Sequence, residues 1–123
     1  MQLLLIEDSS MARLVIERHL KAVGWKVVSA VDGWQALAWC LKQPFDLIVT
    51  DRELPDFNGE EFARRLRSRR NPNRHTPVVA LSATVTPEIA EDCAKSGIVA
   101  LFEKPLQRRD VISMLRHALP KAG

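Results

Sequence analysis

Five polar or charged residues each follow a short apolar run of the kind that forms buried β-strands. Asp51 comes directly after one such run, and Glu7, Asp8, Ser82 and Lys104 follow comparable runs elsewhere in the chain. In a parallel sheet all strands point the same way, so residues just beyond their carboxyl ends share one edge, where open sheets of this kind bind ligands. We call this the carboxyl edge and expect the five side chains to form one site there.

Three of these residues are carboxylates, and bringing them together has an electrostatic cost. Glu7, Asp8 and Asp51 would repel one another by kilocalories at close range unless a cation neutralises them. A set of oxygen ligands without Cys or His selects Mg²⁺, for which Mn²⁺ can substitute. Mg²⁺ commonly keeps several waters and bridges to a phosphate. The acids therefore predict a magnesium site and a phosphorylated substrate or intermediate.

The remaining residues at the carboxyl edge suit phosphoryl transfer. Lys104 offers a compact positive charge and Ser82 a hydroxyl, the groups needed to hold phosphoryl oxygens while charge spreads over them. Asp51 can then be the nucleophile, because an aspartate that attacks phosphorus forms an acyl phosphate. Thr84 and Glu53, two residues beyond Ser82 and Asp51, are expected to flank the phosphoryl group. Simple solvation of these two loop side chains is the alternative.

Apolar runs alternate with longer helical patterns along the whole chain, which gives five repeated βα units. The runs are rich in Val, Ile and Leu without polar alternation, as in strands buried on both faces of a parallel sheet. The pattern predicts a doubly wound α/β fold with five strands and five helices. The strands are expected near residues 3–6, 26–29, 46–50, 77–81 and 99–102.

Residues typical of helix ends separate these units. Gly24 and Gly97 are expected to end the first and fourth helices. The expected N-caps, all with a side-chain oxygen, are Ser9 or Ser10, Asp32, Asn58 and Thr86. The helix boundaries therefore support the division into βα units.

The composition bounds the class of protein. The chain has 123 residues, 46% hydrophobic and 27% charged, which fits one globular domain, expected over residues 1–119 with a tail at 120–123. The N-terminus has no basic segment and no long apolar run, so neither a signal peptide nor a membrane-spanning helix is expected. We therefore expect a cytoplasmic domain without membrane contact.

An arginine-rich segment accounts for much of the formal net charge of +3. Such a run can attract nucleic acid or an acidic partner. The segment begins on a helical pattern, however, and no nucleic-acid-binding motif accompanies it. A solvated helix end is favoured, and no direct contact with nucleic acid is expected. The run comprises Arg64, Arg65, Arg67, Arg69, Arg70 and Arg74.

Other groups with chemical potential have structural interpretations. Cys40 and Cys93 form no CxxC pair and have no His at metal-ligand spacing, so both are expected to be reduced, buried and structural. The three His residues lie far apart and are expected to be structural or solvated. Trp25, Trp34 and Trp39 are expected to serve packing, away from the carboxyl edge.

The chain resembles the response-regulator receiver domain of bacterial two-component signalling over nearly its whole length. The resemblance is carried by Glu7-Asp8 as the acid pair, Asp51 as the phosphoacceptor, the loop 54–59, Ser82-Ala83 as hydroxyl plus small residue, and Lys104-Pro105 as the lysine with a cis-linked proline. It implies a flavodoxin-like sheet with strand order 2-1-3-4-5. It also implies a phosphoacceptor that promotes its own phosphorylation and dephosphorylation, and not a true enzyme.

The resemblance also implies roles for individual residues. Asp8, Asp51 and the backbone carbonyl of Glu53 are expected to contact Mg²⁺, with Glu7 acting through water. Ser82 and Lys104 are expected to bind the phosphoryl group.

The switch position departs from the common receiver pattern. Receivers often carry Tyr or Phe three residues before the lysine as a rotating switch, whereas this chain has Leu101. A Leu followed by Phe102, with an Arg-rich third helix, resembles receivers embedded in hybrid sensor kinases, which pass phosphate onward. The expected partners are a sensor histidine kinase, a histidine-phosphotransfer domain, or both. A free single-domain regulator is the alternative.

Three other functions were weighed against the phosphoacceptor. A degenerate receiver acting as a phosphorylation-independent binding module conflicts with the complete acid set. An aspartyl-phosphate phosphatase of the haloacid dehalogenase type needs a second Asp two residues after the nucleophile, where this chain has Glu53. A flavodoxin-like cofactor binder needs a phosphate loop rich in Ser, Thr and Gly after the first strand, and none follows here.

The first helix predicts a docking surface. A rotation of about 100° per residue separates two faces of this helix. Met11, Leu14 and Arg18 fall on the outer face near the acid pair, and together with Pro105 and Leu106 they are expected to dock a helical histidine-phosphotransfer domain. Isolated exposed apolar residues are common, so a surface without a partner is the alternative. The face expected to pack on the sheet comprises Ala12, Ile16, Leu20 and Val23.

Overall fold

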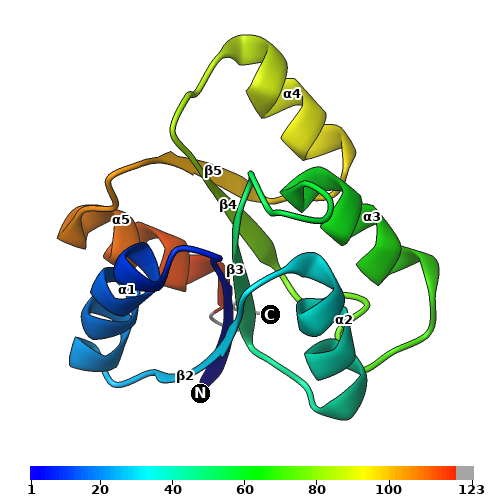
Figure 1. Cartoon of the computed structure of the whole chain (residues 1–123), viewed down its shortest axis with the longest axis horizontal. Coiled ribbons are helices and arrows are strands. Elements are labelled where there is room, and N and C mark those ends of the chain that lie inside the picture. Colours follow the sequence, from blue (N-terminus) through cyan, green and yellow to red (C-terminus); the bar gives the residue numbers. More distant parts are fainter. Residues whose placement is uncertain (119–123) are drawn as a thin grey trace.

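Five parallel strands form a single sheet, and each strand is followed by a helix (Figure 1). The strands are β1 (Gln2–Ile6), β2 (Lys26–Ala30), β3 (Leu47–Asp51), β4 (Val78–Ser82) and β5 (Ala100–Glu103). The helices are α1 (Ser10–Ala22), α2 (Gly33–Lys42), α3 (Gly59–Ser68), α4 (Pro87–Lys95) and α5 (Arg108–Leu115), followed by the 3-10 turn η1 (Arg116–Ala118). The strand order β2-β1-β3-β4-β5 confirms the predicted doubly wound, flavodoxin-like fold.

The computed structural model describes residues 1–118. The end of the domain predicted at 119 and the tail predicted at 120–123 lie outside the described residues. Among residues 1–118, no helix is long and apolar enough to cross a membrane.

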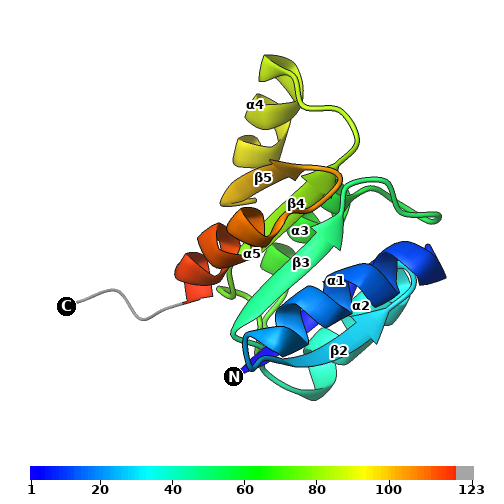
Figure 2. The same ribbon diagram turned by 90° about the vertical axis from the view of Figure 1, so that its left-hand side faces the viewer.

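The helices cover the sheet as two layers. Helices α1 and α5 lie on one face, and α2, α3 and α4 lie on the other (Figure 2). Side chains alternate along β1, so that Leu3 and Leu5 enter the core under α1 and α5, whereas Leu4 and Ile6 enter the core under α2 and α3. Both faces are buried, which explains why the strand sequences show no polar alternation.

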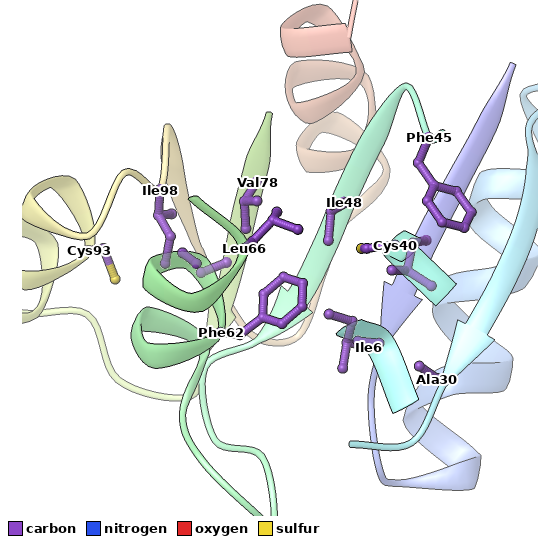
Figure 3. Close-up of a cluster of buried hydrophobic side chains, with 14 residues drawn as sticks. Ile6, Ala30, Cys40, Phe45, Ile48, Phe62, Leu66, Val78, Cys93 and Ile98 are labelled. Carbon is purple, nitrogen blue, oxygen red and sulfur yellow. The ribbon is translucent and has the colours of Figure 1, made fainter. Parts of the chain in front are cut away.

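The core between the sheet and α2, α3 and α4 is built around Phe62 (Figure 3). Phe62 is fully buried, and Ile48 of β3 and Cys40 of α2 belong to the same cluster. Complete burial of such a side chain contributes about 1.5–3 kcal/mol. Cys40 and Cys93 are free thiols within this core, as predicted, and burial raises the pKa of Cys40 to about 12. Its thiol therefore stays protonated.

Side-chain caps begin four of the helices as predicted. The oxygens of Ser9, Asp32, Asn58 and Thr86 accept hydrogen bonds from backbone N–H groups three residues later, at 3.3, 2.7, 2.8 and 3.2 Å. The glycines expected after α1 and α4 both adopt positive φ, 92° at Gly24 and 90° at Gly97.

The connection between α3 and β4 departs at one residue from the prediction that the arginine run is a solvated helix end. Arg67 is half-buried, and its guanidinium donates to the carbonyls of Arg74 and Thr76, each at 2.8 Å. Asn73 holds the loop from the other side. Its side-chain oxygen accepts from Phe45 N, and its Nδ2 donates to the carbonyls of Cys40 in α2 and of Gln43, the C-cap of α2. Arg67 is thus a structural clamp, because the loop leaves these carbonyls without strand or helix partners.

Two predictions about packing are wrong. Val23 was expected on the sheet-facing side of the first helix, yet it is 41% exposed, because α1 ends at Ala22 and Val23 is its C-cap. Trp34 was expected to pack away from the carboxyl edge, yet it is 57% exposed at the start of α2, beside the loop that follows Asp51. Trp25 and Trp39 are partly buried against the core, as predicted.

Candidate functional site

Strand register aligns the ends of the four strands that carry the site. Ile6 pairs with Thr50, Asp51 with Leu81, and Ser82 with Glu103. Residues at or just past these positions therefore lie side by side at the carboxyl edge. The predicted convergence of acids, hydroxyl and ammonium follows from this register.

The three predicted acids form one cluster. Glu7 and Asp8 follow β1, Asp51 is the last residue of β3, and one carboxylate oxygen from each lies within 4.8 Å of the others. Glu7 and Asp51 are buried, whereas Asp8 is exposed. The oxygen-only donor set and its one solvent-facing member fit the predicted Mg²⁺ site. Among residues 1–118, no other group of His, Cys, Asp or Glu comes together in this way.

Lys104 neutralises part of this cluster. Its Nζ lies 2.8 Å from Asp51 Oδ2 and 3.1 Å from Glu7 Oε1. Burial opposes the charge of Lys104, but the two carboxylates outweigh burial and raise its pKa above the ordinary value. Burial raises the pKa of Glu7, and the charge of Asp51 adds to this while the bond from Lys104 opposes it. The site is thus held by one cation that bridges two buried acids.

The two oxygens of Asp51 have different partners. Oδ2 meets Lys104, while Oδ1 accepts a hydrogen bond from the backbone N–H of Glu53 at 3.1 Å. The start of α3 lies close to the end of β3. A Cβ added to Gly59 would lie 3.2 Å from the Asp51 carbonyl oxygen and from a methyl of Thr50. Glycine at this position therefore lets the helix approach the strand that carries Asp51.

Ser82 lies on the opposite side of Asp51 from the acid pair. Its hydroxyl donates to the backbone carbonyl of Thr84 at 2.6 Å, and its own carbonyl accepts from Lys104 N at 2.9 Å. Thr84 and Glu53 expose their side chains to solvent. The Lys104-Pro105 peptide is cis, as predicted. Leu101, at the position where receivers often carry an aromatic residue, is half-buried in β5.

Two residues near the site were missed by sequence reasoning. Arg13, on the second turn of α1, donates from Nη1 to the carbonyl of Glu7 at 2.9 Å. The carboxylate of Asp56 accepts from Gly33 N at 3.0 Å and Trp34 N at 2.9 Å, which ties the loop after β3 to the start of α2. Slight burial opposes the charge of Asp56, but these bonds hold its pKa below the usual value. Asp56 belongs to the loop 54–59 that carries the family resemblance, but no sequence pattern indicates either contact, since both depend on loop geometry.

The predicted docking residues are only partly brought together. A groove of 510 Å³ between α1 and the loop after β5 reaches Lys104 and is lined by Met11, Pro105 and Leu106, three of the expected residues. Leu14 and Arg18 are exposed but do not line it. Val15 lines it instead, because the groove follows the side of α1 that also carries Ala12 and Ile16, and Leu14 and Arg18 are turned away from that side.

Comparison with known proteins places the chain in a family. Residues 3–116 match the family described as the response regulator receiver domain. The sensory/regulatory protein RpfC of Xanthomonas campestris is 32% identical over 116 residues, which covers 94% of this chain and 16% of that protein. The sensor histidine kinase AruS of Pseudomonas aeruginosa is 33% identical over 124 residues, 100% of this chain and 12% of that protein. The chain therefore spans less than a fifth of these relatives.

Solved structures show the same fold. The chemotaxis response regulator CheY4 of Vibrio cholerae superposes with a TM-score of 0.87 at 28% identity, covering 96% of this chain and 98% of that one. The receiver domain of a Pseudomonas aeruginosa sensor histidine kinase, solved with a magnesium ion coordinated in its active-site cleft, superposes with a TM-score of 0.84 at 31% identity, covering 94% and 93%. These likenesses confirm the predicted resemblance to receivers of sensor kinases, and the chain belongs to the response regulator receiver domain family.

Proposed function

We propose that this chain is a phosphoacceptor that takes a phosphoryl group from a phosphohistidine onto Asp51 in a Mg²⁺-dependent reaction. The observation that carries the proposal is the position of Asp51, whose carboxylate lies beside the acid pair and 2.8 Å from the ammonium of Lys104. A neighbouring cation and an acid cluster that can bind a metal are what an aspartate needs to accept a phosphoryl group. A purely structural ion pair does not need Asp8, whose carboxylate faces solvent.

The acid cluster is proposed to hold the metal. Asp8, Asp51 and the backbone carbonyl of Glu53 would contact Mg²⁺ directly, and Glu7 would act through a water molecule. Mg²⁺, with Mn²⁺ as a substitute, would supply positive charge to the acids and to one phosphoryl oxygen. The magnesium-bound receiver of Pseudomonas aeruginosa supports this assignment by likeness.

The remaining side chains are proposed to hold the phosphoryl group. A carboxylate oxygen of Asp51 attacks phosphorus, the P–N bond to the donor histidine breaks, and the electron pair returns to the imidazole. Lys104 and Ser82 bind phosphoryl oxygens, which requires Lys104 to share its contact with Asp51 and the Ser82 hydroxyl to turn from the Thr84 carbonyl. Water later cleaves the acyl phosphate, and the exposed side chains of Glu53 and Thr84 flank its approach.

The proposed partners are a sensor histidine kinase, a histidine-phosphotransfer domain, or both. The groove lined by Met11, Val15, Pro105 and Leu106 is proposed to receive the helical donor, because it is apolar and ends at Lys104. Leu14 and Arg18 stay predicted contacts outside the groove. Leu101 in place of an aromatic switch favours relay of the phosphoryl group, and a cytoplasmic location agrees with such partners.

A mass measurement tests the chemistry. Incubation with acetyl phosphate and Mg²⁺ is expected to add about 80 Da to the protein, and Asp51→Asn is expected to abolish this increment. The same mass gain at the same rate in Asp51→Asn would reject Asp51 as the phosphoacceptor.

A second measurement tests the donor surface. Met11→Glu is expected to slow transfer from a phosphorylated histidine-phosphotransfer domain while labelling by acetyl phosphate stays unchanged, because the small donor needs no docking surface. Equal slowing with both donors would place the defect in the site and not in the groove.

A further inference from the structure

A second groove lies between α2 and α3, away from the acid cluster. It has a volume of 390 Å³, and Leu37, Ala38 and Leu66 are among the residues that line it. Trp34 and Leu41 line the same groove from α2 and are 57% and 66% exposed. Large apolar side chains that are exposed together at one groove are typical of an interaction surface.

The two walls of this groove differ in chemistry. Trp34 and Leu41 lie seven residues apart on α2, two helical turns and about 10.5 Å along its axis. Arg65 on α3 and Arg69, the C-cap of this helix, lie four residues apart, about 6 Å along the helix axis. The α2 wall is therefore an apolar stripe and the α3 wall a basic stripe.

The basic wall has more positive charge than its own helix neutralises. Between residues 59 and 76 there are six arginines and two glutamates. Glu60 is buried and paired with Arg52 at 3.1 Å, and Glu61 is shared by Arg64 and Arg65. Within residues 1–118, Arg69 and Arg70 form no ion pair. This surface therefore offers charge to an acidic partner.

One arginine of the groove is already held in place. The guanidinium of Arg65 lies 4.8 Å from the ring centre of Trp34 and 4.6 Å from that of Phe57, and the two rings stand perpendicular at 5.2 Å. Glu61 accepts from its Nε at 3.1 Å. A guanidinium stacked in this way loses little side-chain freedom when it binds a carboxylate.

We propose that the α2–α3 groove docks an amphipathic helix of a protein partner that carries an apolar stripe beside an acidic stripe. Apolar side chains about two turns apart on this helix would contact Trp34 and Leu41, and acids one turn apart would meet Arg65 and Arg69. Nucleic acid also binds arginines, but it does not match the aliphatic lining of Leu37, Leu41 and Leu66. The groove is separate from the Lys104 groove, so binding there does not require Asp51 chemistry.

A designed peptide probes this groove. A fluorescein-labelled helical peptide of roughly 18 residues, with leucines on one stripe and glutamates beside it, is titrated with the protein and followed by fluorescence anisotropy. We expect saturable binding that weakens with salt and that a peptide with lysines in place of the glutamates does not reproduce. Amide NMR shifts are expected to map to α2 and α3, and Asp51→Asn is expected to bind equally well.

Matched variants locate the contact. Leu41→Glu and Arg69→Glu are each expected to weaken binding about tenfold or more, because one removes an apolar contact and the other reverses a charge. Ile112→Glu and Arg109→Glu make the same changes on the exposed surface of α5 and are expected to leave binding within about twofold. Circular dichroism of all four variants confirms that the fold is retained.

Three outcomes would overturn the proposal. The first is no binding of the acidic peptide at about 1 mM protein. The second is equal weakening by the α5 variants, or NMR shifts confined to the Lys104 groove. The third is tighter binding of a single-stranded oligonucleotide than of the peptide, lost in Arg69→Glu and retained in Leu41→Glu, which would identify a nucleic-acid surface.

Discussion

Positive charge serves two different ends in the two regions of this molecule. At the carboxyl edge, one ammonium, that of Lys104, lies within 3.1 Å of two buried carboxylates. On α3 and the loop after it, several guanidinium groups face solvent. Within the described range 1–118, only Arg64 and Arg65 of this segment have an acidic partner, Glu61, which they share. The first charge is partly desolvated between two carboxylates, whereas most of the second set is exposed and screened by salt.

The effect of a charge on a neighbouring atom depends on how far the charge is fixed and desolvated. A fixed charge near a low-dielectric interior acts strongly on a neighbouring atom, as Lys104 does on the pKa of Glu7. Solvated charges act weakly on any one atom but together attract a partner of opposite sign. Mutations at the carboxyl edge should therefore change chemistry and stability, whereas mutations on α3 should change association with a partner.

The largest expected effect is that of Lys104→Met. Removal of the ammonium should slow labelling by acetyl phosphate about 100-fold, because a donor to the transferring phosphoryl oxygens is lost. Mg²⁺ should still bind, since no metal ligand is changed. Without metal, two buried acids are left uncompensated, so the free energy of unfolding should fall by about 2 kcal/mol and recover in Mg²⁺. Labelling kinetics, and urea unfolding in EDTA and in Mg²⁺, test this prediction. Labelling of Lys104→Met at the wild-type rate would show that the ammonium does not act on the phosphoryl group.

Gly33→Ala should displace Phe57, whose ring contacts both Trp34 and Arg65. A Cβ at this position would overlap the ring of Phe57, so the ring must move away from Trp34 and Arg65. Overpacking of this kind costs about 1–3 kcal/mol, measured by urea unfolding. Trp34 fluorescence should change as well. Gly24→Ala is the control: no atom lies within 4 Å of its added Cβ, but its φ of 92° is strained, so it should lose stability without a change in Trp34 emission.

Glu7→Gln should change the pH dependence of stability. The pKa of Glu7 is raised in the folded state, so the folded state holds this proton more tightly than the unfolded state. Stability contributed by Glu7 is therefore present at low pH and lost as pH rises from about 4.5 through the raised value. In EDTA, Glu7→Gln should lack this decline and be more stable than the wild type near pH 7. Urea midpoints at pH 4.5 and pH 7 that move in parallel for both proteins would contradict this sign.

Arg64→Ala should have the smallest effect. Its ion pair with Glu61 at 3.2 Å is exposed, and Arg65 competes for the same carboxylate, so the change in unfolding free energy should stay below about 0.5 kcal/mol. Thermal unfolding at low and high salt measures it. A loss of unfolding free energy as large as that of Lys104→Met would show that the exposed charge of Arg64 is not screened by solvent and salt.

Strand ends were predictable from the sequence because a parallel sheet obeys one simple rule. Uninterrupted apolar runs predicted buried strands, and the residues after them had to meet, which located Glu7, Asp51 and Lys104 without any knowledge of distance. Contacts made by loops obey no such rule. Asp56 reaches the start of α2 across 22 residues, and Trp34 at this point is exposed beside Arg65. Helix periodicity alone could not give either position.

The span of the Lys104 contacts has a consequence for synthesis of the chain. Lys104 pairs with Glu7 across 97 residues and with Asp51 across 53. Ribosomes add about 5–20 residues per second, so seconds pass between the appearance of the acid pair and that of its counter-ion. A nascent chain, or a proteolytic fragment that ends before β5, therefore has Asp51 but not the ammonium beside it. Competence for the proposed reaction would thus report that the last strand has been added.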